Sequence, residues 1–348
     1  MIIEINEINH KDHISQDLEK FIENNHNSFI QHSICWSKST AYSSKEKLIV
    51  FELKEKNKIL GLIIFNLLFD DNIKVMTSIS GPASIGGPII SGENNNQNTI
   101  LNLLLNSVVE FCKKEGVEVC TIVTNPLDSN IKEIITNFNP ELTFRNFTQI
   151  TNLKNFEIKN NITVINNLEN KLSFHENYVD ESSFNEFYEF YKIIYLKKNY
   201  KIFEKEYLKK ICFGMHNNCR IFFVKKNHEI KGTLLSFFNK NIAEYFLAAC
   251  TNEIRCTNEF LVKKITNVFK EKNIKYLNFQ SSTNFNDGVF NFKKKFNTEL
   301  KYYFFLSKIF IKKDELIKKN VFYSNISNRF IIPYAFNYYH NYNMSYIK

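Results

Sequence analysis

The sequence predicts an α/β protein of two similar halves, each a mixed and mostly antiparallel twisted sheet flanked by helices. Three observations predict this class. The 348 residues exceed the usual size of one domain. Hydrophobic residues make up 44% and charged residues 23%, which excludes a disordered, collagen-like or coiled-coil chain. Segments of the first half also recur in the second half in the same order, as expected of a duplication.

Three pairs of segments carry this repeat. FNPELTF at 138–144 resembles FNTELKY at 296–302, and FCKKEGVEV from 111 resembles FKEKNIKYL from 269, both at an offset of 158 residues. Upstream, a strand, a polar turn and a strand that begins near Gly61 recur around Gly232 at an offset of 171. The larger offset is explained by a glycine- and proline-rich insert at 81–92 in the first half.

Hydrophobic periodicity predicts the same element order in both halves. In the first half it predicts strands 47–53, 59–68 and 73–80, helix 97–115, strand 117–124, helix 127–138 and strand 142–151. In the second half it predicts helices near 182–199 and 203–214, strands 220–225, 231–238 and 242–250, helix 255–272, strand 275–281, helix 287–296 and strand 299–309. In this order, the strand after the long helix can lie parallel to the strand before it.

We assign residues 1–153 to an N-terminal domain and 154–310 to a C-terminal domain, with the polar run 154–170 between them. Residues 311–348 form a basic and aromatic tail. Nine aromatic residues lie within 321–348, and tyrosine is suited to the boundary between water and lipid. The tail is therefore expected to pack on the body of the protein or to contact a membrane surface.

The net charge of +9 is concentrated near the C-terminus, because residues 291–320 carry nine lysines and three acidic residues. This zone favours an anionic partner such as a nucleotide, a lipid diphosphate, tRNA or a membrane face. A solvated lysine surface is the alternative. The scarcity of arginine argues against DNA binding.

The cysteine pattern and the N-terminus indicate a cytoplasmic protein, peripheral at the inner membrane face if the tail binds there. The seven cysteines contain no C-x-x-C pair, which is typical of reduced thiols and gives no zinc site. Acidic residues among the first dozen argue against a signal peptide. The longest apolar run, 59–69, is too short to span a bilayer.

The segment GPASIGGP at 81–88 is the first candidate site. Four of the nine glycines lie between positions 81 and 92. Gly86 and Gly87 therefore imply a positive φ or a close approach of the backbone. Exposed backbone N–H groups there could hold an anion or a carbonyl oxygen. A purely structural loop is the alternative.

The segment QSSTNFNDG at 280–288 is the second candidate, because it follows a strand and precedes a short helix. Hydroxyl and amide groups at Ser281, Ser282 and Asn286 are placed to hydrogen-bond a ligand at the carboxyl end of that strand. Lys293 lies one turn into the helix. A capping turn with Asn286 or Asp287 as N-cap is an alternative that is compatible with ligand binding.

For candidate residues elsewhere in the chain, a role in packing is the alternative to a role in binding. Trp36, the only tryptophan, is more often a packing anchor than a binding residue. Tyr191 and Lys198 lie on a helix whose apolar stripe is mostly scaffold. None of the eight histidines stands in a familiar hydrolase spacing, which argues against a nucleophilic triad.

Taken together, these segments resemble the Fem-like acyl and aminoacyl transferases, which consist of tandem GNAT-type domains. The resemblance covers nearly the whole chain. It rests on Trp36-x-Lys38, Gly86-Gly87-Pro88, the helix leading to Lys197-Lys198, Ser281-Ser282 followed by Gly288 and Phe292-Lys293, and the tail segment Arg329 to Pro333.

The resemblance implies two tandem GNAT-like domains and transfer of an acyl or aminoacyl group onto an amine of a cell-envelope or polysaccharide precursor. By analogy, Lys38 and Lys198 would hold the phosphates of an anionic nucleotide- or lipid-linked acceptor. Trp36, Gly86, Gly87 and Tyr191 would also contact substrate. The region from Ser281 through Asn286 to Lys293 would lie near the donor crevice.

Three departures from the family pattern bear on the donor. Asn297 replaces a glycine, which is tolerable because asparagine accepts the left-handed conformation. The Q/R-x-x-G-x-G/A loop for the acetyl-CoA pyrophosphate is missing, and TNEIRCTN stands at 251–258 instead. A long charged hairpin of the kind that holds tRNA is also missing. The donor is therefore open between acyl-CoA and aminoacyl-tRNA.

The expected mechanism is direct attack of the amine on the carbonyl, with no covalent enzyme intermediate, so that positioning supplies much of the rate. Backbone N–H groups at a strand irregularity would stabilise the oxyanion. Glu244 is the candidate general base, directly or through water, and pairing with a lysine is its alternative. No metal and no tightly bound cofactor are expected. The alternative functions are an aminoacyl-tRNA-dependent peptidyltransferase of the peptidoglycan type and a non-catalytic GNAT-fold scaffold module.

Overall fold

The computed structural model describes residues 1–8, 15–41, 46–70, 73–78, 85–92, 96–159, 161–282, 285–312 and 315–316. It divides into two compact units, of which unit 1 contains Met1–Asn146 with the chain from Tyr302 onward and unit 2 contains Phe147–Lys301. The aromatic tail at 321–348, including Arg329 to Pro333, lies outside the described residues.

Unit 1 is built on a mixed sheet with the strand order β1-β2-β3-β4-β6-β13. Its strands are β1 (Ile2–Ile8), β2 (Lys47–Glu55), β3 (Lys58–Asp70), β4 (Ile73–Thr77), β6 (Val119–Val123) and β13 (Glu299–Ile309), and the short β5 (Ile89–Ile90) pairs with β3. The helical segments are α1 (Gln16–Asn24), η1 (Ile30–His32), α2 (Ile34–Thr40), α3 (Gln97–Glu115) and α4 (Ile131–Phe138). Strands β4 and β6 are parallel, and the other neighbours on this path are antiparallel.

Period-two alternation along β2 and β3 creates two apolar faces in unit 1. Phe51 and Ile63 belong to the core cluster formed with α3 and α4. Val50 and Leu62 belong to the cluster formed with α1. The central strands are therefore buried on both faces, as their nearly continuous apolar sequences require.

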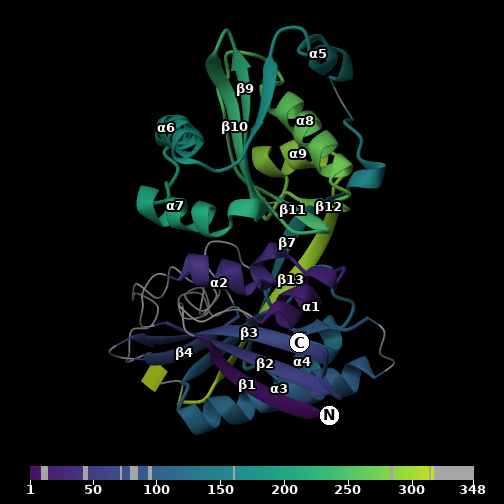
Figure 1. Cartoon of the computed structure of the whole chain (residues 1–348), viewed down its shortest axis with the longest axis vertical. Helices are drawn as coiled ribbons and strands as arrows, with labels where there is room; N and C mark the ends of the chain where they lie inside the picture. The colour runs from purple at the N-terminus through teal and green to yellow at the C-terminus, as the bar shows by residue number, and fades with distance from the viewer. Residues whose placement is uncertain are drawn as a thin grey trace. The chain divides into compact units, whose positions relative to one another are not determined.

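Unit 2 repeats this plan with the strand order β7-β12-β11-β10-β9-β8. Its strands are β7 (Leu142–Asn152), β8 (Ser173–Asn177), β9 (Cys219–Lys226), β10 (Glu229–Phe238), β11 (Ile242–Cys250) and β12 (Tyr276–Asn278). The helical segments are η2 (Leu153–Asn155), α5 (Ile162–Asn167), α6 (Glu181–Lys197), α7 (Lys205–Gly214), η3 (His216–Asn218), α8 (Thr257–Glu271) and α9 (Gly288–Lys294). Helices α6 and α7 lie on one side of β9 and β10, and α8 and α9 lie on the other (Figure 1).

The predicted α/β class and the repeated element order are confirmed. Helix α3 begins and ends at the predicted residues, as do strands β11 and β13. In both units the strand after the long helix is parallel to the strand before it. Asn297 has φ +52°, the left-handed conformation expected for a substitute of glycine.

The last strand of each half pairs with a strand of the other half. This differs from the division into domains that we made from the sequence. Strand β7 pairs with β12 of unit 2, and β13, which we assigned to residues 154–310, pairs with β6 of unit 1. The boundaries between the two units fall within these strands, after Asn146 in β7 and after Lys301 in β13. Leu316, within the predicted tail, belongs to a buried cluster that also contains Leu68 and Ile73.

All seven cysteines are free thiols. Within the described ranges, no helix has both the length and the hydrophobicity that a bilayer span requires. In the same part of the chain, no three His, Cys, Asp or Glu side chains gather as a metal site needs.

Candidate functional site

The parallel strands of unit 2 separate at Glu244. Strands β11 and β12 pair from Ile242 and Tyr276 to Glu244 and Asn278. Beyond this point the N–H of Phe279 donates to the carbonyl of Gln149 on β7, at 2.8 Å, while β11 continues along β10. A register shift between β10 and β11 leaves Phe246 as one extra residue in β11, two residues after Glu244. Such bulges occur next to active sites, where they redirect the backbone.

Glu244 lies inside this region with only 1% of its surface exposed. Its Oε2 accepts hydrogen bonds from Asn278 Nδ2 at 2.9 Å and from Gln280 Nε2 at 3.4 Å. The Asn278 Oδ1 in turn accepts from the hydroxyl of Thr148 at 2.5 Å. Gln280 has φ +61°, an uncommon conformation for glutamine, and residues held in such conformations cluster at functional sites. The carboxylate is thus fixed by amide donors from β12 and the segment after it.

Lys293, on helix α9, forms hydrogen bonds with the backbone of the segment that follows β12. Its side chain is buried, and Nζ donates to the carbonyls of Gln280 at 3.0 Å and Ser281 at 2.7 Å. Burial lowers the pKa of Lys293 to about 8, and the nearby carboxylate of Asp287 opposes this shift. A neutral amine has two N–H groups, which these carbonyls can accept, and one lone pair. Lys293 can therefore exchange a proton near neutral pH.

A second set of hydrogen bonds fixes the chain between β12 and α9. The side chain of Gln149 donates to the carbonyl of Phe290 at 3.2 Å and accepts from the hydroxyl of Ser282 at 3.2 Å. Asp287 is the N-cap of α9, as one of the two predicted candidates, and accepts from the N–H of Phe290 at 2.6 Å. Glu244 and Lys293 are therefore held by a polar network rather than by a loose loop.

The corresponding region of unit 1 is filled by its own backbone. The N–H of Ser78, just after β4, donates to the carbonyl of Thr121 at 2.9 Å, and its hydroxyl accepts from the N–H of Val123 at 2.9 Å. A Cβ on Gly86 would lie 2.4 Å from the carbonyl oxygen of Ser78, and one on Gly87, where φ is +88°, would lie 2.8 Å from that of Val123. Close backbone contact thus explains both glycines.

His32 forms hydrogen bonds with the backbone of both Phe29 and Gly86. Its Nδ1 accepts from the N–H of Phe29 at 2.9 Å, so Nε2 carries the proton and donates to the carbonyl of Gly86 at 2.8 Å. Complete burial lowers the pKa of His32 to about 4, which keeps the ring neutral near pH 7. Sequence reasoning missed this residue, because no neighbouring residue in the sequence marks it.

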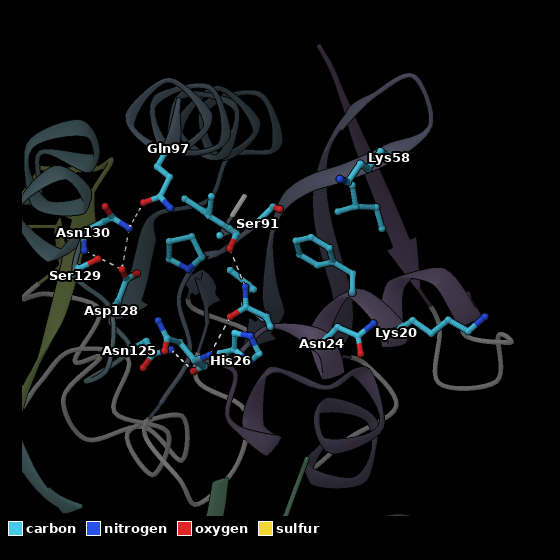
Figure 2. A pocket seen from close by; sticks show the side chains of 18 of the residues that line it. Lys20, Asn24, His26, Lys58, Ser91, Gln97, Asn125, Asp128, Ser129 and Asn130 are labelled. Atoms are coloured by element: carbon cyan, nitrogen blue, oxygen red, sulfur yellow. Dashed lines mark hydrogen bonds between the residues drawn. The ribbon is translucent and has the colours of Figure 1, made fainter. Parts of the chain in front are cut away.

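Unit 1 also contains a polar pocket of about 780 Å³ (Figure 2). It is lined by α1, the turn before β3, residues 88–92, the start of α3 and residues 125–130. Asn125, Asp128 and Asn130 lie on one side, and Lys20 and Lys58 lie on the other (Figure 2). The volume falls within the usual range for small-molecule sites.

Hydrogen bonds fix the amide side of this pocket. Asn130 Nδ2 donates to Gln97 Oε1 and to Asp128 Oδ1, both at 3.1 Å, and Asn125 Nδ2 donates to the carbonyl of Asn27 at 2.6 Å. Burial raises the pKa of Asp128. The sequence did not reveal these residues, because 49 asparagines give any single one little weight.

The structure brings together four of the predicted site residues. Glu244, Ser281, Ser282 and Lys293 are joined through Gln280 and Gln149, and Ser281 is exposed whereas Ser282 is buried. Asn286 is exposed and has φ +65°, directly before the N-cap of α9. Of the residues that form the network, Asn278, Thr148 and Gln149 were missed, although polar residues inside apolar strands were a usable signal.

The other predicted residues lie elsewhere. Trp36 and Lys38 are on α2 of unit 1, where Trp36 is fully buried and Lys38 is partly exposed. Tyr191 on α6 is buried, and its hydroxyl accepts from the N–H of Phe203 at 3.0 Å. Lys198 is the exposed C-cap of α6. Both Trp36 and Tyr191 are thus enclosed by protein, in line with their structural alternatives.

No protein-family model and no curated protein sequence matches the chain. Among solved structures, FemX aligns over 90% of this chain and 99% of its own, with a TM-score of 0.69 at 14% identity. The chain has a Fem-like tandem GNAT fold. L-PGS from Bacillus licheniformis gives a TM-score of 0.56 at 12% identity and covers 88% of this chain and 96% of its own. A tandem GNAT protein from the clavulanic acid biosynthesis pathway gives 0.51 at 9% identity and covers 90% and 100%.

Proposed function

We propose that this chain is a transferase of the GNAT and Fem kind, with its chemistry in unit 2. It would move an acyl or aminoacyl group from a thioester or ester onto an amine of a cell-envelope or polysaccharide precursor. The observation that carries the proposal is the buried group formed by Glu244, Gln280 and Lys293 where β11 and β12 separate. The fold shared with FemX and the tandem GNAT protein supports the reaction class.

In the proposed reaction the amine nitrogen bonds to the donor carbonyl carbon, and the C–S or C–O bond to the carrier breaks. The amine loses one proton and the leaving group gains one. Glu244, as a carboxylate that accepts from two amides, would take the proton directly or through water. Lys293, whose pKa is lowered to about 8, would be mostly protonated near pH 7 and could return a proton to the leaving group.

Unit 1 is proposed to bind the acceptor, because its own strand separation is filled at Gly86 and Gly87. The amide and hydroxyl groups of its pocket suit the hydroxyl and amide groups of a sugar or peptide precursor. Lys20 and Lys58 can pair with the anionic group of a nucleotide-linked or lipid-linked acceptor, and Asp17 and Asp128 of the same lining can pair with its amine. Lys38 and Lys198 would bind the acceptor phosphates, as the family resemblance implies.

A second candidate is the same transfer from aminoacyl-tRNA. Helix α8 begins at Thr257, within the segment TNEIRCTN at 251–258, with Cys256 as its N-cap at φ +65°, and no glycine-rich pyrophosphate loop precedes it in the sequence. This sequence favours an ester donor over acyl-CoA. The basic zone around residues 291–320 offers a contact for RNA, and such binding would weaken steeply with salt.

The proposal is tested by incubating the full chain with acyl-CoAs or charged tRNA, together with amine-bearing nucleotide-linked sugars and peptides, and by mass spectrometry of the products. Wild type and the control variant Lys132→Met, whose substituted residue is exposed on α4 outside the basic zone, should give an acylated product. Lys293→Met should reduce the rate by about 100-fold. A folded protein that yields no product with any donor would favour the non-catalytic scaffold instead.

A further inference from the structure

The C-terminal end of helix α6 exposes an apolar cluster on unit 2. Ile193, Leu196 and Tyr200 are 52%, 53% and 53% exposed. The first two lie three residues apart, on one face of the helix, while Tyr191 and Ile194 of the same turns are buried. We name Ile193, Leu196 and Tyr200 the α6 patch. Helix α6 therefore presents apolar side chains to solvent in addition to those that it packs into unit 2.

The backbone of the α6 patch is fixed by the way the helix ends. Asn199 has φ +55°, and the N–H of Tyr200 donates to the carbonyl of Tyr195 at 2.9 Å. The N–H of Asn199 donates to the carbonyl of Leu196 at 3.1 Å, which completes a Schellman motif. The rings of Tyr195 and Tyr200 meet edge to face, with centroids 5.5 Å apart. Tyr200 is thus held against the last turn of the helix.

The α6 patch is surrounded by positive charge. Residues 190–203 contain four lysines and no acidic residue; the lysines are Lys192, Lys197, Lys198 and Lys201. Two acidic residues outside this segment already have ion-pair partners. Glu189 pairs with Lys205 at 3.3 Å, and Glu253, whose pKa Lys231 and Lys197 help to lower, pairs with Lys231 at 2.6 Å. Glu204 directly follows the segment as the exposed N-cap residue of α7, and its side chain makes no capping hydrogen bond, so it offsets only one of the four lysine charges. The surface around the patch is therefore suited to an anionic partner.

We infer that the α6 patch is a contact site for an anionic lipid bilayer. Apolar and tyrosine side chains within a group of lysines are typical of helix surfaces that lie in the lipid headgroup region. The long lysine side chains can extend to lipid phosphates while the three apolar side chains enter the acyl boundary. A protein partner fits less well, because lysine is depleted in the cores of protein interfaces. This contact goes beyond group transfer and does not depend on it.

The test is flotation of the full chain with vesicles of phosphatidylcholine alone or of phosphatidylcholine with phosphatidylglycerol. Wild type should float with the anionic vesicles, less so at high salt, and should not float with the neutral ones. Ile193→Ser with Leu196→Ser should weaken the binding by about tenfold or more. The matched control is Leu103→Ser with Ile162→Ser, because these residues are also exposed, at 36% and 55%, but lie on other helices. The control should bind as wild type does.

A second variant, Lys197→Gln with Lys201→Gln, removes two positive charges and keeps the apolar side chains of the α6 patch. It should bind anionic vesicles more weakly than wild type does. Thermal unfolding of each variant confirms that it is folded. Wild type that fails to float with anionic vesicles, or an Ile193 and Leu196 variant that floats as well as wild type, overturns the inference. Self-association in sedimentation experiments that the serine variant abolishes, without vesicle binding, would assign the α6 patch to a second copy of the chain and also overturn it.

Discussion

Replacement of Lys293 by methionine should stabilise the fold near neutral pH. Methionine has a similar length and removes the cost of burying a charge. The pKa of Lys293 is lowered from 10.5 to about 8, which corresponds to about 3 kcal/mol. Loss of the hydrogen bonds to the carbonyls of Gln280 and Ser281 offsets this gain by about 1 kcal/mol each. We therefore expect Lys293→Met to be about 1 kcal/mol more stable near pH 7.

The pH dependence of this difference is the sharper test. Because the pKa of Lys293 is lowered in the folded state, that state binds fewer protons than the unfolded state between about pH 8 and pH 10.5. Wild type should thus gain stability as pH rises through this range, whereas Lys293→Met lacks this contribution. Urea unfolding followed by circular dichroism should show wild type gaining about 2 kcal/mol on the variant between about pH 7 and 9.5. Lys294→Met, at an exposed position, should show no such change. A constant difference between wild type and Lys293→Met would refute the reasoning.

Three further predictions concern other parts of the two units. Glu244→Gln preserves the shape of a buried side chain but removes the proton acceptor. Steady-state kinetics should therefore show kcat falling by about 100-fold with little change in KM. An unchanged kcat would exclude Glu244 as the general base. Gly87→Ala should destabilise the chain by about 2 kcal/mol in urea unfolding, because φ is +88° and the Cβ would contact Val123, whereas Gly92→Ala, with open space around it, should have little effect. The lowered pKa of His32 means that stability should fall from about pH 6.5 to pH 4, by up to about 3 kcal/mol, and His32→Gln should lose this slope in acid titrations.

Local pattern predicted most of the fold because the helices and strands follow the spacing of apolar residues. Ile100, Leu104 and Val108 recur at helical spacing along α3 and are all fully buried, and Gly116 ends the helix at φ +65°. The exchange of β7 and β13 between the units was not predictable in this way. Alternation along a strand indicates which side chains are buried but not which strand lies beside it.

The candidate site was predictable where unusual residue types gather in the sequence. Ser281, Ser282 and Lys293 belong to one polar segment, and the structure joins them through Gln280 and Gln149. The glycines at 86 and 87 were correctly predicted to need positive φ or close backbone approach, yet the approach is to the protein's own strands. The pocket in unit 1 was not predicted, because its asparagines come from segments far apart in a chain rich in asparagine.

Hydrogen exchange with non-transferable donor analogues tests most directly whether unit 2 holds the reaction centre. The probes are an S-acetonyl analogue of acetyl-CoA and a 3′-aminoacylamino adenosine, each at saturating concentration. One of them should slow exchange in peptides covering 242–250 and 276–296, and leave 73–78 and 119–125 unchanged. Protection confined to the latter two segments would place donor binding in unit 1 and contradict the account.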